Sequence, residues 1–483
     1  MIPRSLDEHI QQRLFFFETK HRRMNYKQFA IWASALVIIL SGCKENEFTH
    51  ALPANSTALM SVDIGKASGV GSNALLKALL MVSNTDDGGI DLMQKAYLFE
   101  TADGYLGLCA AVRDADHLVE TFSAMSAKGR CKVLDKSGDA FVSVLGDAWA
   151  VAFNDDALLV AGPVAIAEQQ QMQSRLVRYL AQDAERSGMA SPMFQKLDSI
   201  DAPMALVAQV KALPEQMAIP FMLGAPRDAD PSQVLVAAAM KAEKQCLLMT
   251  GHTFSFNKKT DAALQEAAQV FRPLQGSYLN TVSKDAALGL FVNVEGTRFL
   301  PLMHQNAGLQ TLLAGINAAI DMDNIIKSVD GEMAITMPVL SDKKLSLTMV
   351  AQLAHSQWLA DVGYWKDSCP KGGQILPWAP DGYSYQNGDD AFYFGVKGAS
   401  ASAVSKSPLQ FYSGTTAEQA RAAIADAEQP LSASVQEHLK DARLGMVVNM
   451  GDFTSDEGLA GKLLPILKDV FGDVKTIVYK TTR

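Results

Sequence analysis

The sequence has few cysteines, and their spacing excludes the usual cysteine-based metal sites. The 483 residues include five cysteines, at positions 43, 109, 131, 246 and 369. No two of them form a CxxC pair, and no cysteine and histidine spacing matches a zinc site. Cys109 and Cys131 lie near enough in the chain to form a disulfide after export, and buried free thiols are an equally good interpretation.

The sequence also lacks the signatures of common enzymes. HExxH, GxSxG and the P-loop do not occur. The segment Gly69–Ala74 reads GxGxxA, but it starts too far after the preceding strand, and no acidic strand end follows at the spacing of a dinucleotide site. We therefore expect no catalytic residues and no cofactor, and we interpret the protein as non-enzymatic.

Isolated polar residues do not assemble into a recognisable metal site either. Acidic pairs stand at 86–87, 155–156 and 389–390 beside glycine or asparagine, a pattern typical of turns rather than of a calcium loop. Histidines are scattered singly at 117, 252, 304, 355 and 438. With a formal net charge of −9, the chain should also repel nucleic acid.

No apolar stretch is long enough to cross a bilayer. The longest runs from Phe29 to Leu40, whereas a membrane-spanning helix needs about 20 residues. Lys27 precedes this stretch, and small residues follow it, which is the order of a signal peptide. The segment Leu40–Cys43 resembles the bacterial lipobox, in which cleavage precedes a cysteine that receives a lipid. We predict an upstream extension and lipoprotein signal peptide over 1–42, with lipidation of Cys43.

The residues after Cys43 suggest where the protein is located. We interpret residues 43–52 as a tether, in which the charged run Lys44–Glu47 resembles the signal that sends lipoproteins of Bacteroidetes-type bacteria to the outer face of the outer membrane. A solvated linker explains the run equally well. We predict a protein lipid-anchored to the outer membrane, on its cell-surface or periplasmic side. Translation from Met24 would give a signal peptide of ordinary length.

The remainder repeats one series of elements at offsets of 230 to 252 residues. The alternating strand at 58–64 matches 288–294, and the strand at 158–162 matches 410–414. Because helices interrupt hairpins rather than alternate with strands, the pattern favours an α+β fold with largely antiparallel sheet. We predict two similar repeats with packed helices, at 53–272 and 280–483, of which the second lacks a counterpart of the hairpin at 234–256.

Aromatic residues crowd one window of the second repeat, where flat rings beside polar residues can stack on sugars or hold a peptide. The alternative is that Trp358 packs inward and that the others occupy alternating strand positions. As candidate residues for binding a glycan or protein partner we name Trp358, Trp365, Trp378, Tyr383 and Tyr385.

Several segments together resemble an uncharacterised family of Bacteroidetes lipoproteins, domain of unknown function 4836. The resemblance rests on the Cys43 motif, Leu52–Ile64, Ser191–Leu197 and Asp330–Glu332, and it covers nearly all of residues 43–483. It implies an outer-membrane lipoprotein and no particular reaction. Our leading hypothesis is a non-enzymatic binding or scaffold protein, and the alternative is an extracytoplasmic hydrolase with a dispersed active site.

Overall fold

The computed structural model describes most of the chain after the predicted signal peptide. The described residues are 47–63, 88–213, 218–243, 245–339, 346–388, 390–399, 408–450 and 474–482. All but Glu47 belong to one compact unit, Phe48–Arg483. Cys43, residues 1–42 and the motif Gly69–Ala74 lie outside the described residues. Among those described, no helix combines the length and the apolar character that a membrane span requires.

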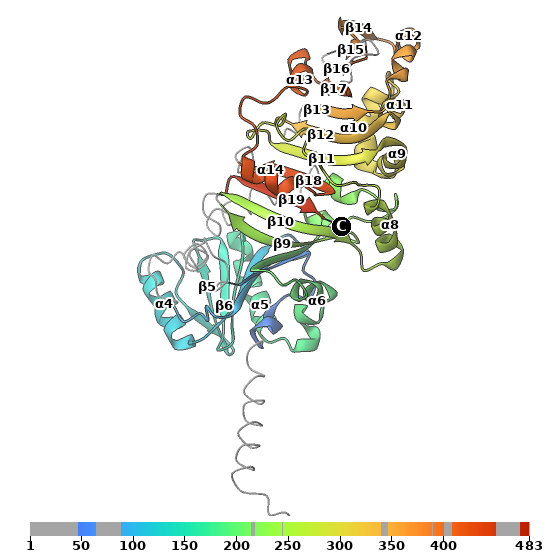
Figure 1. Ribbon diagram of the computed structural model, residues 1–483. Coiled ribbons are helices and arrows are strands. Elements are labelled where there is room, and N and C mark those ends of the chain that lie inside the picture. Colours follow the sequence, from blue (N-terminus) through green and yellow to red (C-terminus); the bar gives the residue numbers. More distant parts are fainter. Residues whose placement is uncertain are drawn as a thin grey trace, which may run out of the picture. The chain divides into compact units, whose positions relative to one another are not determined.

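In the described part of the chain, nineteen strands form a single sheet, which can be followed as two successive runs (Figure 1). Within each run, neighbouring strands are antiparallel. The first run, in spatial order, consists of β4 (Asp135–Ser137), β5 (Ala140–Leu145), β6 (Trp149–Phe153), β7 (Ala157–Gly162), β3 (Leu106–Ala111), β2 (Lys95–Glu100), β1 (Ala58–Asp63), β8 (Met204–Gln209), β9 (Leu235–Glu243) and β10 (Cys246–Phe254).

The second run continues the same sheet. Its strands, again in spatial order, are β14 (Gly373–Ala379), β15 (Gly382–Asn387), β16 (Asp390–Lys397), β17 (Leu409–Gly414), β13 (Thr348–Leu353), β12 (Val329–Met337), β11 (Leu288–Glu295), β18 (Leu444–Asn449) and β19 (Thr476–Thr481). The expected α+β fold with largely antiparallel sheet is confirmed.

The two runs meet where β10 pairs with β19. This pair is parallel, with Cys246 opposite Thr476 and Gly251 opposite Thr481. The other edge of β10 is occupied by β9, and the other edge of β19 by β18. Both strands are therefore interior to the sheet, and the backbone groups of one run satisfy those of the other.

Helices cover both faces of the sheet, and several of them begin at polar caps. Ser191 accepts a hydrogen bond from the backbone N–H of Phe194, and Asp114, Asn257 and Asn306 cap other helices in the same way. The α-helices are α4 (Ala115–Ala127), α5 (Gln169–Leu180), α6 (Pro192–Asp198), α8 (Lys258–Ala268), α9 (Gly296–Gln305), α10 (Ala307–Asn317), α11 (Met322–Lys327), α12 (Val362–Asp367), α13 (Ala417–Ala422) and α14 (Ala433–Leu439).

Short 3-10 helices complete the described elements. One of them, η6, packs beside the junction of the two runs, where Phe221 contacts Tyr479 of β19. They are η1 (Glu47–Ala51), η2 (Ile166–Glu168), η3 (Ala184–Arg186), η4 (Gly188–Ala190), η5 (Val210–Ala212), η6 (Ile219–Met222) and η7 (Gln357–Asp361).

Alternating strand residues build a hydrophobic core on each face. In β18, Met446 and Val448 join the core that contains α8 and α9, whereas Val447 joins the opposite core with α14. Cys109 and Cys131 lie in cores on opposite faces of the first run. Both are free, buried thiols, the second of the two interpretations made from the sequence.

A buried carboxylate ties the segment after α8 to the second run. Glu332 of β12 is buried, and its side chain accepts hydrogen bonds from the backbone N–H groups of Gln275, Gly276 and Ser277. Nearby, Arg272 contacts Asp330 at 2.8 Å. The predicted repeat boundary therefore lies against β12, and Glu332 is one of the groups that hold it there.

We predict that Glu332→Ala lowers the free energy of unfolding by about 3 kcal/mol, because three backbone donors lose a charged acceptor. Urea denaturation monitored by circular dichroism measures the change. Glu437→Ala is the control, because this exposed residue forms a surface pair with Lys440 at 2.8 Å, and such pairs contribute at most about 1 kcal/mol. Equal effects of the two substitutions would contradict the role of Glu332.

Candidate functional site

A hollow lies beside the β10–β19 pair, and we call it the junction groove. It has a volume of about 890 Å³ and is bordered by η6, β10, α8, β18 and β19. Its apolar lining consists of Pro220, Phe221, Leu223, Leu264, Ala268, Phe271, Leu444 and the ring of Tyr479, and its polar lining of Thr250, His252, Thr253, Gln265, Gln269, Arg443, Thr481 and Thr482. A lining that combines apolar side chains with a few polar groups is typical of a small-molecule site.

Gly251 and the ring pair of Phe221 and Tyr479 form two parts of the junction-groove lining. Gly251 lies on β10 opposite Thr481, and a Cβ atom at this position would collide with the carbonyl oxygen of Ala237. The strand therefore needs glycine there, and no side chain extends from that position into the groove. On the other side, the rings of Phe221 and Tyr479 meet edge to face with centroids 4.9 Å apart.

The hydroxyl of Tyr479 is unusual among the groups around this groove. It is buried, and no hydrogen-bond partner for it occurs among the residues that the structure describes. Burial raises the pKa of Tyr479, so the hydroxyl stays protonated at neutral pH. The ring of Tyr479 supplies apolar surface here. Its hydroxyl is a buried polar group without a hydrogen-bond partner in the described part of the chain.

Arg443 supplies the permanent charge of the junction groove. Its guanidinium donates to the carbonyl oxygen of Phe271, and its backbone N–H donates to Thr481 at 2.8 Å. No Asp or Glu is among the described residues that line the groove. Because a guanidinium has five N–H donors, the described contacts leave Arg443 with donors for an anionic group.

A second hollow, the aspartate groove, lies between α10–α11 and η7–α12. It has a volume of about 580 Å³ and is lined in part by Asp321, Asp323, Asp361, His304, Tyr364 and Trp365. His304 Nε2 lies 3.0 Å from Asp323 Oδ1, and Asp321 accepts from the backbone N–H of Asn324 at 3.0 Å. Within the described residues, no group of three or more His, Cys, Asp or Glu side chains is arranged to hold a metal ion.

The aromatic residues named from the sequence divide into two sets. Trp358, Trp365 and Tyr385 are buried in the core. The rings of Trp358 and Trp365 stack with centroids 6.0 Å apart, and Trp358 also contacts Phe394 and Phe411. Their position favours the inward-packing alternative for Trp358. Trp365 nevertheless contributes to the wall of the aspartate groove, next to Tyr364, which is 73% exposed.

The other two named residues, Trp378 and Tyr383, are half-buried on β14 and β15. Trp378 donates from Nε1 to the carbonyl oxygen of Tyr383 at 2.9 Å, and the Arg421 guanidinium lies 4.9 Å from its ring centroid. Lys366 stands over the Tyr383 ring at 5.1 Å. These rings are already covered by cations of the chain itself, so stacking of a ligand there would have to displace them.

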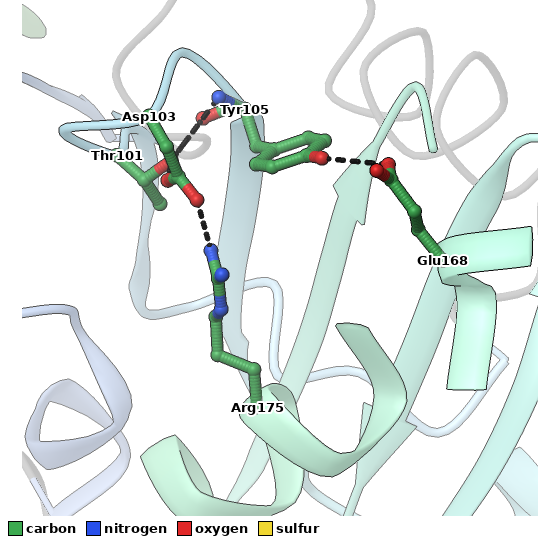
Figure 2. A network of polar contacts seen from close by, with 5 residues as sticks. All are labelled: Thr101, Asp103, Tyr105, Glu168 and Arg175. Carbon is green, nitrogen blue, oxygen red and sulfur yellow. Dashed lines mark hydrogen bonds and ion pairs between the residues drawn. The ribbon is translucent and has the colours of Figure 1, made fainter. Parts of the chain in front are cut away.

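A polar network joins α5 to the turn between β2 and β3. Figure 2 shows Arg175 reaching from the helix toward Asp103, while Tyr105 extends toward Glu168. Arg175 Nη1 lies 2.6 Å from Asp103 Oδ2, and the Tyr105 hydroxyl donates to Glu168 at 2.9 Å. Thr101 donates to the other carboxylate oxygen of Asp103 at 2.6 Å.

This network changes the acidity of Asp103. Partial burial, the largest single contribution, raises its pKa, but hydrogen bonds from Thr101 and Arg175 and the charge of Arg175 outweigh it, so the pKa lies below its ordinary value. Asp103 also lines a small hollow of about 440 Å³ with Arg175, Arg178 and Tyr179. The Asp103 carboxylate partly neutralises the positive charge of the two arginines in this hollow. We therefore assign the network a structural role.

We predict that Asp103→Asn destabilises the protein at neutral pH and has little effect at about pH 2. A carboxyl whose pKa is lowered by folding contributes stability above its unfolded pKa of about 3.9, and this contribution is lost as the pH falls through the folded value. Urea midpoints of both proteins between pH 2 and 7 measure the effect. In an Arg175→Met background the difference should shrink, and a difference independent of pH would disprove the assignment.

Sequence reasoning missed the junction groove and the aspartate groove. Phe221, Arg443 and Tyr479 come from distant segments, and no local motif marks them. The only available signal was Gly251, a glycine inside a strand pattern, which can indicate close approach of another backbone or a ligand.

Comparison with known proteins gives a family but no activity. No curated protein matches the chain. A solved structure, crystal form IV of TP0453, matches with 10% sequence identity and a TM-score of 0.27, over 41% of this chain and 76% of that one. This score is too low to imply a shared fold. The model of the family described as a domain of unknown function (DUF4836) matches residues 66–410, more than half of the chain, and the protein therefore belongs to that family.

Proposed function

We propose that this protein is a non-enzymatic binding protein, lipid-anchored through Cys43 to the outer membrane, that holds an amphipathic small molecule in the junction groove. The junction groove is the observation that supports this proposal, because it combines about 890 Å³ of space with both apolar and polar lining residues. An apolar molecule gains by leaving water for such a surface. A polar end of the same molecule can face the threonines and Arg443.

The anchor is proposed from the sequence of the export signal. The 12 apolar residues at 29–40 are too few to span a bilayer, and Cys43 follows the small residues of a lipobox-like site. A single acyl chain gives only marginal membrane binding, whereas a multiply acylated cysteine gives stable anchoring. The protein would face either the cell surface or the periplasm, in a Bacteroidetes-type bacterium.

We further propose that the chain arose by internal duplication into the repeats 53–272 and 280–483. The strand order supports this, since β4-β5-β6-β7-β3-β2-β1-β8-β9 has the same connections as β14-β15-β16-β17-β13-β12-β11-β18-β19. Segments matched from the sequence occupy equivalent places, β1 with β11 and β7 with β17. β10 has no described counterpart in the second repeat, and it covers the edge of β19 instead.

A second candidate function is glycan binding at the aspartate groove. The exposed ring of Tyr364 lies among Asp321, Asp323 and Asp361, and carboxylates beside an aromatic face suit a sugar that stacks and donates hydroxyl hydrogen bonds. A glycan array probed with the purified protein distinguishes this function from binding of an apolar ligand.

We predict that 8-anilinonaphthalene-1-sulfonate, an apolar anionic dye, binds the purified protein saturably with increased fluorescence. Ala268→Trp should weaken this binding by about tenfold or more, because Ala268 lines the junction groove and an indole there would fill it. Tyr364→Ala, in the aspartate groove, is the control and should leave the titration unchanged. Unsaturable fluorescence, or equal binding by Ala268→Trp with an unchanged melting temperature, would contradict the proposed site.

We predict that mass spectrometry of the protein from its membranes finds Cys43 as the first residue, carrying diacylglycerol. Cys43→Ser should abolish the lipid and leave residues 1–42 attached, because cleavage of this class of signal requires the modified thiol. Cys369→Ser, far beyond the signal, is the control and should be processed normally. An unmodified thiol at Cys43 would refute the anchor.

A further inference from the structure

We infer that the ligand of the junction groove is a long-chain fatty acid whose carboxylate binds Arg443. This inference rests on the proposed function, since it names the ligand class of the same groove. Three observations carry it, namely the sign of the charge in the groove, the way in which Arg443 is held, and the apolar surface below it.

The charge in the groove selects an anion. Among the described residues, Arg443 lines the groove, no Asp or Glu does, and the other polar groups are neutral hydroxyls and amides together with His252. A carboxylate entering this groove therefore meets a permanent cation and no repelling charge on the lining. A cationic amphiphile of equal length would instead be repelled by the charge of Arg443.

Arg443 is held before any ligand arrives. Its side chain donates to the carbonyl oxygen of Phe271, and its backbone N–H donates to Thr481, which places the residue at the start of β18 beside the end of β19. A guanidinium fixed in this way loses little freedom on binding. Its planar array of donors matches the two oxygens of a carboxylate.

The apolar lining provides for an aliphatic chain. Phe221, Leu264 and Tyr479 are buried residues whose side chains line the groove, and Leu223, Phe271 and Leu444 extend this surface. Each methylene group buried there should strengthen binding by about fourfold. The ligand thus lies with its chain over the Tyr479 ring and its head at Arg443.

The experiment compares two ligands that differ only at the head. Palmitate and hexadecanol are titrated into the dye-loaded full-length protein below their solubility limits. We expect palmitate to displace the dye at a concentration about tenfold lower than hexadecanol, because only palmitate forms a charge-assisted pair. Arg443→Gln should abolish this preference while hexadecanol still binds, and Arg443→Lys should retain part of it.

Each outcome separates the inference from the proposed function. Equal displacement by the two ligands in the wild-type protein would overturn the inference and leave the groove as a site for neutral apolar molecules. Displacement by neither would overturn both. If lysophosphatidate displaced the dye at a lower concentration than palmitate, a phosphate head would replace the carboxylate and the inference would fail. The wild-type comparison needs no variant, so misfolding of Arg443→Gln cannot obscure the result.

Discussion

The pairing of β10 with β19 is the interaction on which the rest of the structure depends. It is the parallel contact between two runs of antiparallel strands, and it leaves both strands with neighbours on each side. Without it, β10 and β19 would each be an edge strand with one unpaired side exposed to water, an arrangement that favours association with other chains. The same contact brings η6, α8 and the start of β18 together, and the junction groove lies where they meet.

The segments that resemble the family serve the fold rather than any chemistry. Leu52 and Leu59 are fully buried, and Ser191 caps α6 while Phe194 packs beneath it. Glu332 binds three backbone N–H groups at the start of the second run. Membership of the DUF4836 family gives no activity. A function therefore has to be argued from the geometry of the hollows in the fold.

Strand positions were predictable because they depend on neighbours along the chain. The alternating patterns at 58–64 and 288–294 correspond to β1 and β11. The paired aspartates at 155–156 form a turn in which Asn154 accepts from the backbone N–H groups that follow, as turn chemistry predicted. In each case, periodicity or turn preference acts over a few residues.

The sequence by itself determined the alternation of the strands and the acidic composition, because each is a local or summed property of the chain. Only the tertiary structure decided that two runs join through a parallel pair, that Trp358 and Trp365 stack inside the core, and that Phe221, Arg443 and Tyr479 border one groove. The physical reason is that alternation specifies which face a side chain occupies, while long-range packing chooses the neighbouring strand and so brings distant residues together.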